Sequence, residues 1–219
     1  MPYGAWLLLF VIAPLVLLLF QSLTTQDGHF TLANYAIYFG SGTYLLMTFN
    51  SVWYAFLITL ITLVISYPMA YLLNQLKRKQ FWLLLIILPT WINLLLKTYA
   101  FIGLLSKSGT VNNFLGLWGI VPQQLLFSNW SFLLAAAYIE IPFMILPIFN
   151  SLAEIDPRLA QASRDLGANK WQTLWRVTMP LSMSGVKAGI QAVFIPSLSL
   201  FMITRLIGGN RVITLGTAI

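Results

Sequence analysis

The sequence predicts an all-α integral membrane protein, a helical bundle of five visible spans with one long polar loop. Hydrophobic residues make up 59% of the chain and charged residues 8%, whereas an average soluble domain has roughly 25% charged residues. Apolar runs of span length recur along the chain, and the polar exception, QASRDLGANKWQTLWRVTMP at 161–180, lies between two of them. Because so few polar side chains could not cover a soluble fold, the predicted environment is a lipid bilayer.

Composition also excludes several classes of function. The chain has no cysteine and one histidine, so disulfides, thiolate metal sites, cysteine nucleophiles and multi-histidine metal sites are excluded. The 12 basic residues outnumber the 5 acidic ones and give a formal charge of +7. They do not form the basic and aromatic surface that nucleic-acid binding needs, so their predicted role is membrane topology.

Five segments meet the length of about 20 mostly apolar residues that a spanning helix needs. In chain order they are 5–23, 51–73, 81–101, 130–149 and 186–203. Each contains proline, at Pro14, Pro68, Pro89, Pro142, Pro147 and Pro196. Proline suits bundled membrane helices, where neighbouring groups can satisfy the freed carbonyls.

The basic residues predict the orientation of these spans. Eight would lie on one side of the membrane, namely Lys77, Arg78, Lys79, Arg158, Arg164, Lys170, Arg176 and Lys187. Four remain for the other side, namely Lys97, Lys107, Arg205 and Arg211. The positive-inside rule therefore predicts a cytoplasmic N-terminus and a cytoplasmic loop at 151–185. We expect one transmembrane domain over residues 1–219, with a further sixth span beyond Ile219 and a trimmed start.

Two short helices are predicted in the loop at 151–185. Asp156 is a good N-cap, Pro157 suits the first helical position, and Gly167 suits a left-handed C-cap, which gives a helix of about ten residues. Asn169 would cap a second helix, and Pro180 would end it.

Different surfaces are expected to hold these two helices. A helix of about ten residues is marginal alone in water, so the first one needs a docking surface. Its less polar positions are mostly small, which favours a partner groove: Leu159, Ala160, Ala162, Ser163 and Leu166. The second helix carries Trp171, Leu174 and Trp175 at helical spacing, a stripe expected to pack against the bundle or the membrane interface.

The spacing within the loop is that of a known signature. Gln161-Ala162-Ser163, three residues, Gly167, nine residues and Val177-Thr178-Met179-Pro180 follow each other. The pattern resembles the cytoplasmic signature of ABC-importer permeases, which is Glu-Ala-Ala, three residues, Gly, nine residues and Ile-x-Leu-Pro. Ala162, Gly167 and Pro180 agree in identity, while Gln161 stands where the family has an acid.

Further segments resemble the same family. Asp165-Leu166-Gly167-Ala168 is similar to its common Asp-Leu-Gly-Ala run, and Phe30–Tyr35 is similar to its Phe-Thr-Leu-Asp-Asn-Tyr segment. The residues Trp91, Asn93, Lys97 and Tyr99 and the segment Pro142–Pro147 most resemble the branch of first permease subunits of spermidine/putrescine importers.

The resemblance implies a type I importer permease, a multi-pass, non-enzymatic component of the bacterial inner membrane that works by alternating access. It implies half of a translocation pathway, completed by a second homologous permease and served by an extracytoplasmic substrate-binding protein. The first helix of the loop would be the coupling helix, seated in an ATPase homodimer that binds ATP and Mg. No phosphate-loop motif occurs in this chain, which is expected to bind no cofactor itself. The coupling residues would be Asp156, Pro157, Gln161, Ala162, Ser163, Asp165, Gly167, Ala168 and Pro180.

The substrate path is predicted from the residues themselves. Glu140 is the only acid inside a predicted span, and a carboxylate at bilayer depth should face the bundle interior or a cavity. It could serve the path of a polycation or pair with a group on a neighbouring helix. Trp91, Asn93 and Tyr99 follow Pro89, which could break the third span near a cavity, although interface anchoring and helix packing explain them equally well. Lys97 is expected to reach the outer surface.

Polyamines are the leading substrate, and three alternatives stay open. The same machine could carry another small solute such as thiamine, iron or an oxyanion. An ion-coupled secondary transporter that uses Glu140 would keep working without an ATPase. A membrane scaffold would carry no solute at all.

Overall fold

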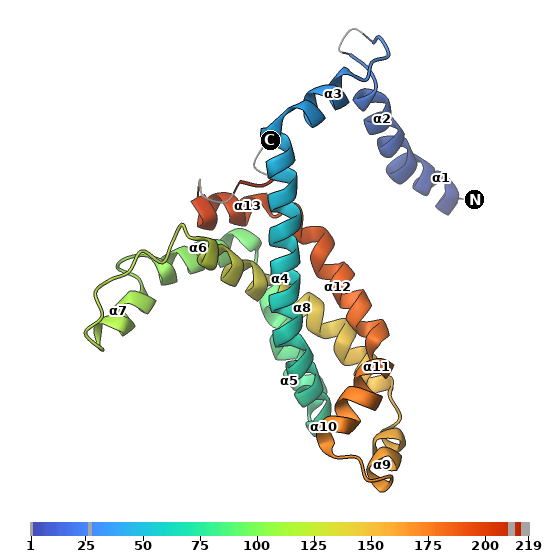
Figure 1. Ribbon diagram of the computed structural model, residues 1–219, viewed down its shortest axis with the longest axis vertical. Helices are drawn as coiled ribbons and strands as arrows, with labels where there is room; N and C mark the ends of the chain where they lie inside the picture. The colour runs from blue at the N-terminus through green and yellow to red at the C-terminus, as the bar shows by residue number, and fades with distance from the viewer. Residues whose placement is uncertain (1, 26–27, 210–212, 216–219) are drawn as a thin grey trace. The chain divides into compact units, whose positions relative to one another are not determined.

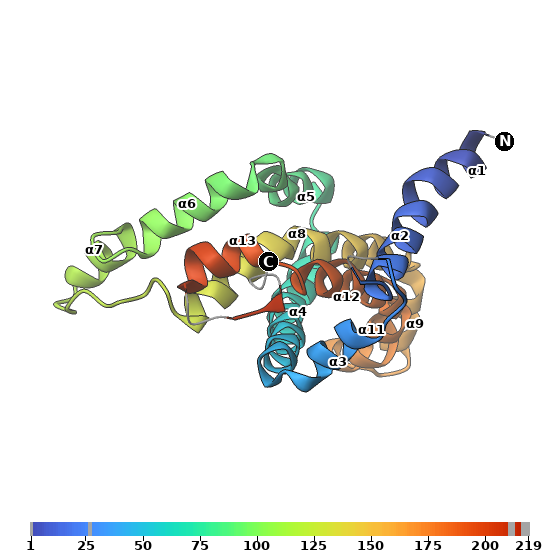
Figure 2. The same cartoon turned by 90° about the horizontal axis from the view of Figure 1, so that it is seen from above.

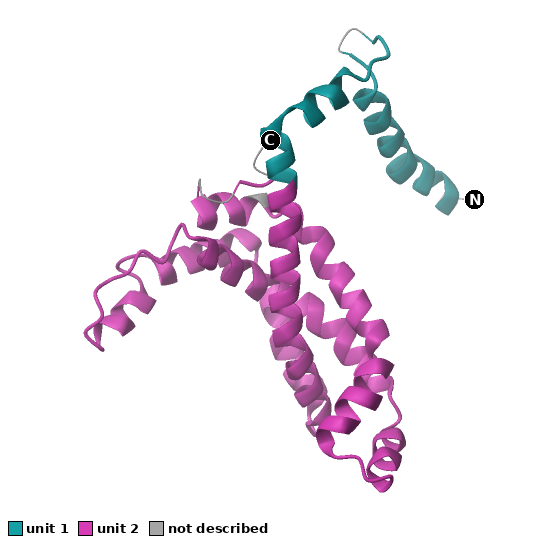
Figure 3. Cartoon of the chain, in the orientation of Figure 1, with its two compact units in different colours: residues 1–48 teal, residues 49–219 magenta. Residues whose placement is uncertain are grey.

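The computed structural model describes residues 2–25, 28–209 and 213–215, and regular structure within these ranges is helical (Figure 1). One isolated antiparallel bridge joins Thr24 and Phe30. The chain divides into two compact units, residues 1–48 and 49–219 (Figure 3), which are described separately.

The first unit begins with a long apolar helix. It consists of α1 (Pro2–Leu7), a π-helical turn η1 (Leu8–Ile12) and α2 (Ala13–Ser22). Pro14 cannot donate a backbone hydrogen bond, and the wider π turn just before it accommodates this loss. A short helix, α3 (Ala33–Gly40), follows, and the Asn34 side chain donates to the Ser22 carbonyl at 3.1 Å.

Three helices form the core of the second unit (Figures 1 and 2): α4 (Gly42–Gln75), which starts in the first unit, α8 (Asn129–Glu154) and α12 (Met183–Ser197). Most of α8 is buried, and Tyr54 of α4 packs edge-on against its Phe132 with ring centroids 5.4 Å apart. The fully buried side chains Ile58, Met144, Ile145, Ile148 and Val193 fill the space between these helices.

The seam between α8 and α12 depends on two glycines of α12. A Cβ atom at Gly185 would lie 2.5 Å from the Pro147 carbonyl oxygen, and one at Gly189 would lie 2.7 Å from the Met144 sulfur. Both distances are too short for any side chain to fit without movement. The two helix backbones are therefore in direct contact, as small residues at i and i+4 allow in membrane helices.

The third expected span, 81–101, is bent. It consists of α5 (Lys79–Ile87), a 3₁₀ turn η2 (Leu88–Trp91) and α6 (Leu94–Leu105), which leads to α7 (Thr110–Gly116). The segments Lys79–Trp91 and Leu94–Gly116 are inclined by 93°. Pro89 lies in the 3₁₀ turn, where its missing N–H and fixed φ favour an interruption. The third expected span therefore contains the break that Pro89 makes possible, and its two halves are not collinear.

Three helices within the described ranges are long and apolar enough to cross a membrane, and the bent pair would make four. They are Tyr3–Ser22, Gly42–Gln75 and Asn129–Glu154. The fifth expected span, 186–203, is divided between α12 and α13 (Phe201–Ile203), because Pro196 lies in the last turn of α12. A π-helical turn, η4 (Thr204–Gly208), follows. The count of five spans stays a prediction, and Arg211, which entered the topology argument, lies outside the described residues.

Candidate coupling loop and substrate path

The first helix of the loop at 151–185, hereafter the coupling loop, begins and ends where its caps predict. Helix α9 covers Pro157–Asp165, and the Asp156 carboxylate accepts the Arg158 N–H at 2.9 Å. Gly167 has a φ of +86°, its N–H bonds the Arg164 carbonyl, and the next N–H, of Ala168, bonds the Ser163 carbonyl. These two bonds form a Schellman C-cap, which glycine favours because it has no Cβ.

The second helix of the coupling loop starts as predicted but does not stop at Pro180. Asn169 and Gln172 form a reciprocal capping box, with bonds of 2.8 and 2.9 Å. Helix α10 (Lys170–Thr173) then passes into a π turn, η3 (Leu174–Thr178), and into α11 (Met179–Leu181). The expectation that Pro180 ends the helix is wrong. The π turn before it accommodates the missing N–H, as happens before Pro14.

The tryptophan stripe is only partly packed. Leu174 packs against the core of the bundle, whereas Trp171 and Trp175 are 68% and 59% exposed. The second helix contacts α9 through the hydroxyls of Ser163 and Thr173, which lie 3.1 Å apart, and Thr173 is buried. The two short helices therefore support each other, and the second holds the first to the bundle.

The predicted coupling residues fall into three groups. Ala162, Ser163, Gly167 and Ala168 line an open hollow of about 510 Å³ on the loop, together with Leu159 and the 89% exposed Leu166. Asp156, Pro157 and Gln161 line another hollow of about 340 Å³ at the ends of α4 and α8. Asp165 and Pro180 line neither. The first hollow is the surface on which a partner could lie, since its centre is made of small side chains and backbone.

Glu140 lies in the interior of the bundle, as its charge predicts. Its side chain on α8 is 4% exposed and interacts electrostatically with Lys97 of α6. Lys97 is half-buried, because α6 packs against α8 through Phe101 and Tyr138, whose ring centroids are 5.3 Å apart. That its ammonium reaches the outer surface stays a prediction. Within the described ranges Glu140 makes no hydrogen bond and no ion pair shorter than 4.0 Å.

The other path candidates do not gather around Glu140 in a closed site. The Asn93 side chain caps α6 and accepts the Leu95 N–H at 2.8 Å, which gives this residue a local structural role. Trp91 is 80% exposed and Tyr99 is 60% exposed. Neither side chain is enclosed by this chain, so both remain available to lipid, to substrate or to a partner subunit.

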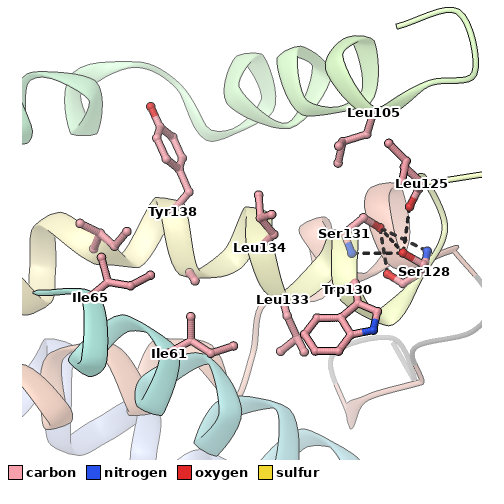
Figure 4. Close-up of a pocket in the computed structure, with 12 residues that line it drawn as sticks. Ile61, Ile65, Leu105, Leu125, Ser128, Trp130, Ser131, Leu133, Leu134 and Tyr138 are labelled. Atoms are coloured by element: carbon pink, nitrogen blue, oxygen red, sulfur yellow. Dashed lines mark hydrogen bonds between the residues drawn. The ribbon is translucent and has the colours of Figure 1, made fainter. Parts of the chain in front are cut away.

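A larger hollow of about 560 Å³ lies between α4, α6 and α8 (Figure 4). Ile61 and Ile65 of α4, Leu105 of α6 and Tyr138 of α8 face it. None of the four substrate-path candidates lines this hollow. Its lining is almost wholly apolar and includes no carboxylate, although Tyr138 and Trp130 present aromatic faces of the kind that cations contact.

Sequence reasoning missed four residues that join the coupling loop to the bundle: Tyr67, Asn74, Ser182 and Gly185. The pair Gly185 and Gly189 has the small-xxx-small spacing of packed membrane helices, a signal that could have revealed the seam. Tyr67, Asn74 and Ser182 carry no local signal, because their partners are distant in sequence.

Comparison with known proteins agrees with this architecture. Residues 36–219 match the family of binding-protein-dependent transport system inner membrane components. The chain is 34% identical to the spermidine/putrescine transport system permease protein PotB of Haemophilus influenzae, over 98% of this chain and 78% of that protein. It is 35% identical to PotB of Escherichia coli, over 98% of this chain and 81% of that protein.

A solved structure shares the fold. The bacterial ABC transporter involved in the import of the acidic polysaccharide alginate superposes with a TM-score of 0.81 at 17% identity, over all of this chain and 80% of that one. Helix content, family match and relatives all agree. The chain belongs to the binding-protein-dependent transport system inner membrane components and is a multi-pass, non-catalytic permease subunit of an ABC importer.

Proposed function

We propose that this chain forms half of the translocation pathway of an ATP-driven importer for polyamines such as spermidine and putrescine. The observation that carries the substrate class is the similarity to PotB proteins over 98% of the chain. The buried Glu140 is consistent with a cationic substrate, since it is a carboxylate inside the bundle with no direct ion pair within the described part of the chain.

The proposed function includes a membrane topology. The chain forms one permease domain over residues 1–219 with a cytoplasmic N-terminus and five spans. The basic residues around the coupling loop support this orientation by the positive-inside rule. A second, similar permease completes the pathway, and a substrate-loaded binding protein docks on the outer side.

The coupling loop is the contact with a separate ATPase homodimer, whose subunits bind ATP and Mg. The support is the open hollow on α9, where Ala162, Ser163, Gly167 and Ala168 leave room for a partner to approach the backbone. Exposed Leu166 and Leu159 flank this hollow and supply apolar area for burial. ATPase closure moves α9, and the spans follow by alternating access.

Substrate and coupling can be tested together in proteoliposomes of the assembled transporter. With polyamine-loaded binding protein outside and ATP inside, labelled spermidine should accumulate, and an uncoupler should have no effect. Accumulation of thiamine, iron or an oxyanion in place of spermidine contradicts the substrate class. Uptake that needs no ATPase and collapses with an uncoupler contradicts the importer mechanism.

The coupling role is tested at Gly167. A Cβ at this position would meet no atom of this chain within 4 Å, so within the chain a substitution acts through the positive φ. Gly167→Val should strain the C-cap by about 1–3 kcal/mol, weaken ATPase association and abolish uptake. Gly167→Asn is the matched control for strain, because asparagine tolerates the left-handed region and places a side chain at the same point of the hollow, so it should retain more uptake than Gly167→Val. Wild-type uptake by Gly167→Val would refute the role.

A further inference from the structure

Helix α4 holds both ends of the coupling loop. Tyr67 and Asn74 are seven residues apart on α4 and so project from the same face, about 10.5 Å apart along its axis. Asn74 contacts the chain where it enters the loop, and Tyr67 contacts the chain where it leaves it. We call these two residues the α4 clasp.

At the entry, Asn74 satisfies a carbonyl that the helix itself leaves free. Its Nδ2 donates to the Leu152 carbonyl oxygen at 3.1 Å, and Leu152 lies in the last turn of α8, where carbonyls lack helical partners. The Lys79 ammonium donates to the Asn74 Oδ1 at 3.1 Å and lies 5.9 Å from the centre of the Phe149 ring. The amide is therefore held on both sides and cannot turn freely.

At the exit, Tyr67 binds a fully buried serine. The Tyr67 and Ser182 hydroxyls are 3.0 Å apart, and Ser182 lies in the turn between α11 and α12. The Ser182 hydroxyl donates to the Met179 carbonyl at 3.1 Å, which leaves its oxygen to accept the proton of Tyr67. Ser182 is 0% exposed and Tyr67 is 8% exposed, so water cannot replace this bond.

The two ends of the loop are also joined to each other. The Ser151 and Ser184 hydroxyls lie 3.1 Å apart, and one residue later Gly185 brings α12 into backbone contact with α8 at Pro147. The entry and the exit of the coupling loop consequently cannot move apart independently. A displacement of the loop has to move both of them, and with them the helix that binds both.

We infer that Tyr67 and Asn74 are positioning residues that transmit movement of the coupling loop to α4. The inference rests on the proposed function of the loop and adds the helix that receives the motion, together with the two hydrogen bonds that pass it on. Because each bond joins α4 to one end of the loop and involves no residue that lines the hollow on α9, removing it loosens α4 from the loop and leaves that hollow unchanged. The ATPase should then still bind, while substrate transport should fall.

The test measures substrate transported per ATP hydrolysed in proteoliposomes of the full transporter with loaded binding protein. Tyr67→Phe and Asn74→Ala should each lower this ratio by about 3- to 15-fold, the range of an interhelical hydrogen bond in a membrane. The ATPase should still copurify, and ATP hydrolysis should continue. Tyr71→Phe and Gln75→Ala are matched controls on α4. Both side chains line the hollow at the ends of α4 and α8, but neither makes a hydrogen bond within ranges 2–25, 28–209 and 213–215.

A double-variant cycle tests the exit contact. Ser182→Ala should lower the ratio, and adding Tyr67→Phe should lower it no further, because both changes remove the same bond. Additive losses would overturn the contact. An unchanged ratio of transport to ATP hydrolysis in Tyr67→Phe and Asn74→Ala would contradict the role of the clasp. A parallel loss of protein yield, ATP hydrolysis and uptake would contradict it too, because it would indicate a merely structural role.

The outcome also separates the clasp from the proposed function. If the wild-type chain copurifies with no ATPase, the proposed function fails and the clasp fails with it. Suppose instead that the complex forms and that Gly167→Val uncouples transport from hydrolysis, whereas the clasp variants do not. In that case the clasp fails and the proposed function stands.

Discussion

The coupling loop and the bend around Pro89 both interrupt the apolar helices, yet they are determined in different ways. In the coupling loop, the start and end of α9 and the start of α10 are each explained by a cap within a few residues, at Asp156, Gly167 and Asn169. At the bend, Pro89 and Asn93 explain the interruption, but not which side chains meet afterwards. Lys97 lies near Glu140 because α6 packs against α8, a contact that no local pattern encodes.

The difference shows which structural features of a membrane protein can be predicted from residues that are close together in its sequence. Caps and breaks use groups that are neighbours in the chain, so residue types and spacing predict them. A polar group inside the bilayer instead needs partners from other helices. Its environment depends on helix packing, which small differences in side-chain volume decide.

The largest expected effect is at the seam, where the coupling loop also depends on distant contacts. In Gly185→Val the new side chain would collide with the Pro147 carbonyl and Ser151, each 2.5 Å from the Cβ position. Backbone cannot yield as a flexible side chain does, so we expect a loss of about 3 kcal/mol or more. Thermal unfolding of the purified permease measures it.

The control for the seam is Gly103→Val on α6, where a Cβ would meet no atom within 4 Å. Its loss of unfolding free energy should be smaller than that of Gly185→Val by at least about 2 kcal/mol, because the new side chain is overpacked at Gly185 but not at Gly103. Equal losses would mean that the α8–α12 contact does not hold the ends of the loop.

The next effect concerns the buried acid. Glu140→Gln keeps the shape of the side chain and removes its charge, so uptake of a polycation should fall about 10- to 100-fold, the range of a charge-assisted contact. Stability should stay the same or rise, because a buried charge without a direct partner is costly. Uptake of labelled spermidine and thermal unfolding are measured on the same preparation.

Glu154→Gln is the matched control for the acid, since Glu154 is the exposed last residue of α8. Its uptake should equal that of the wild type. Full uptake by Glu140→Gln together with unfolding of Lys97→Met would instead assign the buried acid to structural pairing.

A smaller effect is expected at the local caps. Asp156→Ala removes the acceptor of the Arg158 N–H and should destabilise α9 by about 1 kcal/mol. Amide hydrogen exchange should speed up across α9 but not across α8. Asp165→Ala, at the end of α9 and without a cap bond, should leave exchange unchanged, and equal acceleration by both variants would refute a local origin of the helix.

The smallest effect is expected at Gln161, where the family has an acid. Gln161 is exposed, so Gln161→Glu should change the free energy of unfolding by less than about 0.5 kcal/mol. Any response should appear in ATPase affinity, measured by copurification at rising salt. A large loss of stability would mean that Gln161 is a structural residue of the loop.

The sequence by itself determined the membrane environment, the break at Pro89 and the capped helices of the coupling loop, and the resemblance in that loop pointed to the correct family. These features depend on composition and on contacts between residues close in the chain. The 93° bend, the passage of the helix through Pro180, the position of Lys97 and the grip of α4 on the loop were decided by the tertiary structure. Each depends on which helix faces meet, and in a chain that is apolar on nearly every face, hydrophobicity does not distinguish between them.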